Sequence, residues 1–193
     1  MERYDYLIIN SFVENNSKVL DLGCGDGELL RLLEQKPGVE GVGIENDEKM
    51  IYSCVKKDVT VEQSDIDEGL HDFPDKFFDY VIINFTLQET KKPSKVIRES
   101  LRVGKHVIVS FPNFAYYKIR LFLGFRGITP STEALPYRWD ESPNLHYFTI
   151  KDFELFCIDE CIKVEKSVCF TVNRVVKFFP NLLAEKAIFL LSK

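Results

Sequence analysis

Three glycines separate an apolar segment from a leucine-rich one in VLDLGCGDGELL, which runs from Val19 to Leu30. Glycine inside a strand or helix costs roughly 0.5–1 kcal/mol relative to alanine. Gly23, Gly25 and Gly27 therefore predict a backbone that turns sharply or that a ligand approaches closely. A strand, a glycine turn and a helix start bring free backbone N–H groups and the positive end of a helix together. That arrangement suits a nucleotide-bearing ligand.

Short β-branched segments alternate with amphipathic ones along most of the chain. Strands are predicted over residues 18–22, 41–45, 59–63, 78–84, 105–111, 164–170 and 186–192. Helical spacing of apolar residues covers residues 27–36, 47–57, 93–103 and 149–160. Thr149 is expected to cap the last of these helices, with Asp152 at N3. The alternation predicts an α/β fold, with a doubly wound, mostly parallel seven-stranded sheet and helices on both faces.

The alternation stops after the strand at 105–111. Residues 112–148 hold four of the eight prolines and the single tryptophan, and a segment this long without alternation is usually a lid or a binding insertion. Its large polar and aromatic residues suit either a substrate or partner surface or a lid packed on the core; they are Arg120, Arg126, Tyr137, Arg138 and Trp139. A second, shorter insertion is expected around FFPNLLAE. We find no linker and expect residues 1–193 to form a single domain.

Charge and composition argue against several kinds of partner. The net charge is -5 and there is no long basic run, which argues against a nucleic-acid groove or an anionic membrane surface. No signal peptide is recognisable, and no apolar run reaches the ~18 residues of a membrane span. We therefore expect a cytoplasmic protein. The five cysteines contain no CxxC pair and are interpreted as buried reduced thiols, so no metal site is expected.

The next two strand ends carry carboxylates. GVGIEND ends its strand with Glu45, and a carboxylate there can accept both hydroxyls of a ribose, at roughly 1.5–3 kcal/mol per hydrogen bond to a charged group. Asp65 in QSDIDEGL is placed to receive an amino group, and Ile66 offers an apolar face to a base. Glu45 could instead be a solvated strand end, and Asp65, with Asp67 close behind, a solvated acidic turn. The strand ends together suit an amino-acid end, a ribose and an adenine, the three parts of S-adenosylmethionine.

VLDLGCGDG, the acidic Glu45 and SDIDEGL resemble the cofactor motifs of class I S-adenosylmethionine-dependent methyltransferases. Longer segments are similar to the MetW family of methionine-biosynthesis proteins, over nearly all of residues 15–193; they are QSDIDEGLHDFPDKFFDYVIINFTLQET, RVGKHVIVSFPNF, ALPYRWDESPNLHYFTIKDF and FFPNLLAEKAIFLLSK. The resemblance implies a Rossmann-like class I methyltransferase fold with an insertion after the fifth strand. It also implies S-adenosylmethionine or S-adenosylhomocysteine as the ligand, and homoserine O-acetyltransferase as the partner.

The resemblance further implies roles for single residues. Asp21 would help to bind the methionine moiety, and Asn84 with Phe85 would face the sulfonium from the tip of the fourth strand. Asn46 is a weaker candidate beside Glu45, and Cys24 is most simply a small packing residue. The complete set of expected cofactor-binding residues is Asp21, Gly23, Cys24, Gly25, Gly27, Glu45, Asn46, Asp65, Ile66, Asn84 and Phe85.

No catalytic base is identifiable in the sequence. His146 and Tyr137, both in the insertion, are weak candidates, and a lone histidine is more often structural. The resemblance favours a MetW-type protein that binds S-adenosylmethionine and acts with homoserine O-acetyltransferase. The alternative is an S-adenosylmethionine-dependent methyltransferase that acts on a small molecule.

Overall fold

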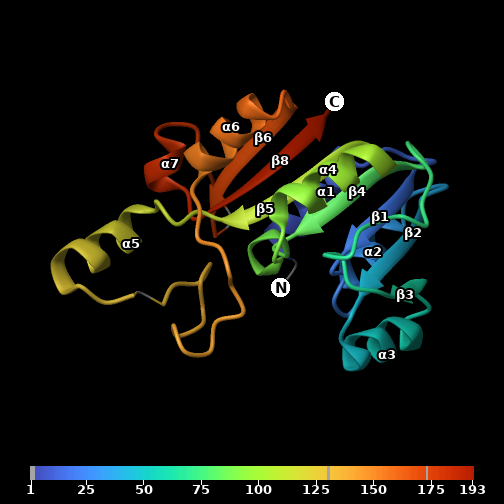
Figure 1. The fold of residues 1–193 in the computed structure, drawn as a ribbon, viewed down its shortest axis with the longest axis horizontal. Helices are drawn as coiled ribbons and strands as arrows, with labels where there is room; N and C mark the ends of the chain where they lie inside the picture. The colour runs from blue at the N-terminus through green and yellow to red at the C-terminus, as the bar shows by residue number, and fades with distance from the viewer. Residues whose placement is uncertain (1–2, 130, 173) are drawn as a thin grey trace.

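One mixed sheet organises the part of the chain that the computed structural model describes, residues 3–129, 131–172 and 174–193. The strand order within these ranges is β3-β2-β1-β4-β5-β8-β6-β7 (Figure 1). The strands are β1 (Lys18–Leu22), β2 (Glu40–Glu45), β3 (Val61–Gln63), β4 (Phe78–Asn84), β5 (Gly104–Pro112), β6 (Lys163–Thr171), β7 (Arg174–Val175) and β8 (Lys186–Ser192). All seven predicted strands are present, with ends that shift by one or two residues.

The count of seven strands is wrong by one. β7 has two residues and pairs antiparallel with the end of β6, through Phe170 with Val175 and Thr171 with Arg174. A strand of two residues is too short to produce an alternating pattern, so the sequence offers no signal for it.

The strand order reverses next to β1. The first five strands of the sheet pair in parallel, and β1 lies between β2 and β4. β8 pairs antiparallel with both β5 and β6. In an open α/β sheet, ligands bind outside the carboxyl ends of the strands at such a reversal. The topology therefore places a crevice at the ends of β1, β2 and β4.

Helices cover both faces of the sheet. The helical segments are α1 (Tyr4–Phe12), α2 (Glu28–Leu33), α3 (Glu48–Lys56), η1 (Leu87–Glu89), α4 (Pro93–Val103), α5 (Tyr117–Leu121), η2 (Phe122–Arg126), α6 (Ile150–Asp159) and α7 (Pro180–Leu183). Successive strand residues enter opposite cores: Val81 and Ile83 pack on the side of α4 and α6, and Ile82 packs on the side of α1 and α2. Both faces are therefore buried, as predicted. The helices of residues 3–129, 131–172 and 174–193 are all too short or too polar to span a lipid bilayer.

The segment 112–148 departs from the sheet and returns to it. It contains α5 and η2, which extend away from the sheet at the left of Figure 1. Leu135 anchors the later part, because it is buried with Tyr116 and Ile119 in a small apolar cluster of its own. Phe125 is 85% exposed and Trp139 77% exposed. The segment is thus tied down at its base and leaves large apolar side chains in solvent.

Four of the five cysteines are buried, and Cys161 is exposed. The expectation of a buried thiol is therefore wrong at this position. α6 ends at Asp159, and Cys161 lies beyond it in a turn with a positive φ of 55°. Cys161 follows the buried Cys157 by four residues, but it does not share a helix face with Cys157 because the helix has already ended.

The capping box predicted at α6 is present. Thr149 Oγ1 accepts from Asp152 N, and the Asp152 carboxylate accepts from Thr149 N. We expect Thr149→Ala to lower the free energy of unfolding by about 1 kcal/mol, since the variant loses an N-cap acceptor. Urea unfolding followed by circular dichroism measures this change. Lys151→Ala, on the exposed side of the same helix, is the control, and an equal loss in both variants would contradict the assignment.

Candidate functional site

A cleft of about 370 Å³ opens at the carboxyl ends of β1, β2, β3 and β4. Its walls come from the loop after β1, the three neighbouring strand ends and the turn that contains η1. The lining residues are Gly23, Gly25, Ile44, Glu45, Asn46, Ser64, Asp65, Ile66, Asp67, Asn84, Phe85, Thr86, Glu89 and Thr90. The volume lies in the usual range for small-molecule sites. Eight residues predicted from the sequence therefore meet at one place.

The glycine loop after β1 is hydrogen-bonded to β2. Ile44 O accepts from Gly23 N at 2.8 Å and from Cys24 N at 3.1 Å. Gly23 and Gly25 have positive φ angles of 72° and 56°. A Cβ atom at Gly23 would lie 2.6 Å from Thr86 Cγ2, whereas one at Gly25 would have no neighbour within 4 Å. Gly23 thus permits a close approach of two loops, and Gly25 presents bare backbone to open space.

The Glu45 carboxylate is held in place by backbone donors. Its Oε2 accepts from Gly25 N at 2.9 Å, and its Oε1 accepts from Asn46 N and Asp47 N at 2.8 and 3.0 Å. Three backbone N–H groups fix a side chain that would otherwise sample several rotamers. Glu45 is therefore more than a solvated strand end. Each carboxylate oxygen has further lone pairs, which remain available to a ligand hydroxyl.

The cleft is strongly acidic. Its lining contains the carboxylates of Glu45, Asp65, Asp67 and Glu89, and no Lys, Arg or His from the described residues. Asp65 Oδ1 accepts from Asp67 N, and Asp67 accepts from the backbone N–H groups of Lys91 and Lys92. Burial, followed by the negative charge of Glu45, raises the pKa of Glu89. The acidic turn is thus ordered, and its field favours a positively charged ligand.

The tip of β4 carries backbone strain. Phe85 has a positive φ of 56°, which is uncommon for a bulky side chain. Ser110 on β5 accepts from Phe85 N through its Oγ at 3.0 Å and donates to Asn84 Oδ1. Such conformations persist only where the surrounding structure imposes them, and they are concentrated at ligand sites. Asn84 and Phe85 are therefore fixed at the cleft by the neighbouring strand.

Asp21, Cys24 and Gly27 do not line the cleft. Cys24 packs beneath the loop, where a Cβ atom on Gly43 would lie 2.4 Å from its Sγ. Burial raises the pKa of the Cys24 thiol, so this sulfur is a packing group. A Cβ atom on Gly27 would lie 3.0 Å from the Sγ of Cys54. These residues shape the loop from behind.

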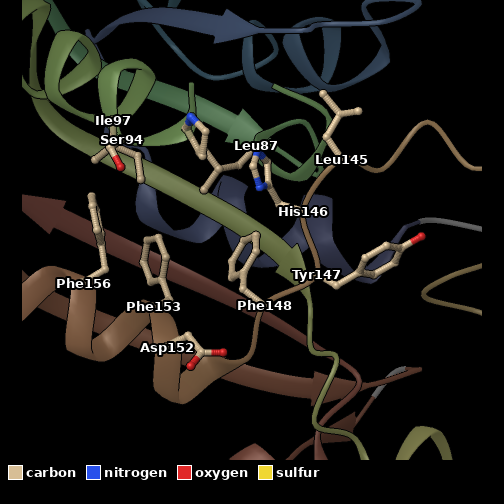
Figure 2. Close-up of a pocket in the computed structure, with 11 residues that line it drawn as sticks. Leu87, Ser94, Ile97, Leu145, His146, Tyr147, Phe148, Asp152, Phe153 and Phe156 are labelled. Carbon is tan, nitrogen blue, oxygen red and sulfur yellow. The ribbon is translucent and has the colours of Figure 1, made fainter. Parts of the chain in front are cut away.

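The two weak catalytic candidates lie in different cavities outside the cleft. His146 lines an apolar groove of about 350 Å³ between η1, α4 and α6, where Phe148, Phe153 and Phe156 form one wall (Figure 2). Tyr137 lines a pocket of about 380 Å³ that shares Phe85 and Glu89 with the cleft. Tyr137 is thus the nearer of the two to the cleft.

Several lining residues were absent from the predicted set. Ser64, Thr86, Glu89 and Thr90 line the cleft, and so does Asp67, which the sequence suggested only as part of a solvated turn. Glu89 belongs to η1, a 3₁₀ turn of three residues. A turn this short has no periodic pattern, so its only signal is the polar segment TLQET directly after a strand end.

Asp21 is a buried carboxylate behind the glycine loop. It is 2% exposed, and its Oδ1 has no hydrogen-bond partner among the described residues. Its pKa is raised to about 7, chiefly because burial disfavours the charged form and secondly because Glu45 is negative; the Arg3 guanidinium opposes this shift. The folded chain therefore binds a proton at Asp21 more tightly than the unfolded chain does.

This shift predicts a pH dependence of stability. Between about pH 4 and pH 7 the folded state holds the extra proton, so the free energy of unfolding falls as pH rises and levels off above pH 7. Asp21→Asn should flatten this decline. The slope that Asp21 contributes, and that the variant loses, is at most about 1.4 kcal/mol per pH unit. Urea unfolding at about pH 5 and about pH 8 measures the effect. The exposed Asp159→Asn is the control, and parallel slopes for Asp21→Asn and the wild type would contradict the prediction.

Solved structures of several methyltransferases have the same fold. The S-adenosylmethionine-dependent methyltransferase from Mesorhizobium loti superposes with a TM-score of 0.72 at 17% identity, over 98% of this chain and 98% of that one. At this level of identity the likeness concerns the fold. It confirms the predicted class I methyltransferase fold.

Two curated relatives have similar sequences. The bifunctional methionine biosynthesis protein MetXA/MetW from Rhodopirellula baltica is 31% identical over an alignment of 193 positions, which covers 93% of this chain and 31% of that relative's length. The demethylmenaquinone methyltransferase from Thermotoga maritima is 27% identical over an alignment of 183 positions, which covers 86% of this chain and 75% of the relative's length. A family model described as methionine biosynthesis protein MetW matches residues 3–191. The chain therefore belongs to the MetW family.

Proposed function

We propose that this protein binds S-adenosylmethionine or S-adenosylhomocysteine in the acidic cleft and acts with homoserine O-acetyltransferase in methionine biosynthesis. The main observation in support of this ligand is the position of Glu45. Three backbone N–H groups hold its carboxylate at the cleft. A carboxylate fixed at the tip of the second strand suits the two hydroxyls of a ribose.

The other residues of the cleft suit the rest of the ligand. Ile66 provides an apolar face for the adenine, with Asp65 beside it as an acceptor for an amino group. Asn84 and Phe85 would contact the sulfonium end from the tip of β4. The four carboxylates of the lining favour a cation, and the sulfonium is one. The bare backbone of Gly25 leaves space for the ligand to lie close to the loop.

Two observations support homoserine O-acetyltransferase as the partner, one from a relative and one from the surface of the insertion. The Rhodopirellula baltica relative is a bifunctional MetXA/MetW protein, which supports an association with homoserine O-acetyltransferase. Segment 112–148 exposes Phe125 and Trp139, and aromatic side chains of this kind dominate protein interfaces. We therefore assign this insertion to docking on the acetyltransferase.

One observation favours the alternative, methyl transfer to a small molecule. The pocket that Tyr137 lines adjoins the cleft through Phe85 and Glu89, so a second molecule could lie next to the sulfonium. S-adenosylmethionine supplies an electrophilic methyl group when it is bound. Positioning of an acceptor in line with that group accounts for much of the acceleration in such reactions. The chain would contribute chiefly the positioning, with Tyr137 as a candidate for accepting a proton.

Glu45→Ala should weaken the binding of S-adenosylmethionine about ten- to a hundred-fold, because the ribose loses a charged acceptor worth about 1.5–3 kcal/mol. Isothermal titration calorimetry measures the affinity, and circular dichroism checks the fold. Glu48→Ala, an exposed carboxylate in the first turn of α3, is the matched control. Unchanged affinity in Glu45→Ala would refute the ribose assignment. A wild type that binds neither S-adenosylmethionine nor S-adenosylhomocysteine would refute the ligand.

The docking assignment has its own test. Phe125→Ser and Trp139→Ala should each weaken binding to purified homoserine O-acetyltransferase at least tenfold, since interface aromatics commonly contribute about 2 kcal/mol or more. Biolayer interferometry measures this binding. Tyr52→Ala on α3, a residue that is 63% exposed, is the control and should bind like the wild type. Equal binding by all three variants would show that the insertion is not the docking surface.

A further inference from the structure

The pocket next to the cleft is charged and polar. Its charged and polar lining includes Arg3, Gln88, Glu89, Glu133, Tyr137 and Lys186, and its volume is about 380 Å³. Phe85 and Glu89 belong to both cavities. Because Phe85 is held in a positive-φ conformation at the end of β4, the boundary between the two cavities is a fixed element of the sheet.

Gln88 brings an unpaired acceptor to this pocket. The side chain is 5% exposed, and its Nε2 donates to Phe85 O. Because Phe85 O can only accept, this bond settles which way round the amide lies. Gln88 Oε1 is then buried with no hydrogen-bond partner among the described residues. Buried polar atoms are nearly always paired in native proteins, so an unpaired acceptor on a residue that lines a cavity is open to a donor from outside the chain, such as a ligand ammonium group.

Glu89 adds a negative charge on the same side. It follows Gln88 in η1, and no donor to its carboxylate is found within the described ranges. Glu89 is an exposed residue, so its carboxylate is free to pair with a cationic ligand. Gln88 and Glu89 therefore contribute two acceptors to the residues that line the pocket, and an ammonium group is a donor that suits both.

The start of β8 contributes a cation to the pocket. The Lys186 side chain is 20% exposed, its Nζ lies 4.0 Å from Glu133 Oε1, and it lies 5.7 Å from the centre of the Phe85 ring. An ion pair at 4.0 Å leaves donors of the ammonium free. Arg3 differs, because its guanidinium is engaged by both oxygens of Asp5, at 3.3 and 2.7 Å. Lys186 is therefore the less engaged of these two cations and the better suited to bind a ligand carboxylate.

We propose that this pocket binds a small zwitterion with an ammonium group and a carboxylate, of the amino-acid class, next to the S-adenosylmethionine cleft. The ammonium group lies toward Gln88 and Glu89, and the carboxylate lies toward Lys186. The proposal rests on the proposed function for the identity of the neighbouring ligand. It defines the kind of molecule that the protein holds beside that ligand, whether as a methyl acceptor or as an effector.

The test uses ligand-observed NMR on the full chain, with and without S-adenosylhomocysteine. The twenty common amino acids and homoserine are screened one at a time, and at least one should bind. The N-acetyl and carboxamide derivatives of that amino acid should each bind at least tenfold more weakly than the amino acid itself, because each derivative lacks one of its two charges. The proposal is overturned if none of the amino acids binds, or if a derivative binds as well as its parent.

Lys186→Met keeps most of the apolar stem and removes the charge. This variant should bind the amino acid at least tenfold more weakly than the wild type does. Its affinity for S-adenosylhomocysteine should stay within about twofold of the wild-type value. Lys177→Met, at an exposed lysine near β7, is the control and should change neither affinity. Equal amino-acid binding by Lys186→Met and the wild type would overturn the pocket assignment. Failure of S-adenosylhomocysteine to bind, with amino-acid binding intact, would count against the proposed function and not against this pocket.

Discussion

The connection between the glycine loop and the end of β2 is the constraint on which the site depends. Ile44 O accepts two backbone N–H groups of the loop, and the Glu45 carboxylate accepts a third. These bonds fix a left-handed backbone at Gly23 and Gly25 that other residues would adopt only with strain. Because the loop is fixed, Thr86 can pack directly against Gly23. The loops after β1 and β4 therefore meet directly at the base of the cleft.

The parallel sheet brings the chemistry of distant segments to one edge. Glu45, Asp65 and Asn84 follow three different strands, yet all line the same cleft. The chain does not need a separate domain to build this site. Strand order alone places the acidic turn of residues 64–68 opposite the tip of β4. The charge that gathers there is uniformly negative, which narrows the ligands that the cleft can accept.

Much of this arrangement could be predicted from the sequence, because strong local patterns produce it. Buried β-branched runs marked the main strands, and the carboxylates at their ends marked the cleft. Asp21 and Cys24 show where local reasoning stops: both belong to the motif, but the turn directs their side chains beneath the loop. Glu89 shows a second limit, because its place in the cleft depends on how a three-residue turn docks after β4. No helix was predicted from the sequence of the segment that forms α1. The structure shows that α1 packs on α2 and β8.

The return of segment 112–148 to the sheet has a mechanical consequence. Leu145 N and His146 N both donate to Gln88 O, at 2.8 and 3.0 Å, so the end of the insertion is fastened to the turn that forms walls of both cavities. Under the proposed docking, a force on the insertion would reach the wall of the cleft through these two hydrogen bonds. By thermodynamic linkage, any change in ligand affinity that docking causes is matched by an equal change in docking affinity when the ligand binds. Under the proposed function, this turn of three residues connects the docking surface to the ligand cleft.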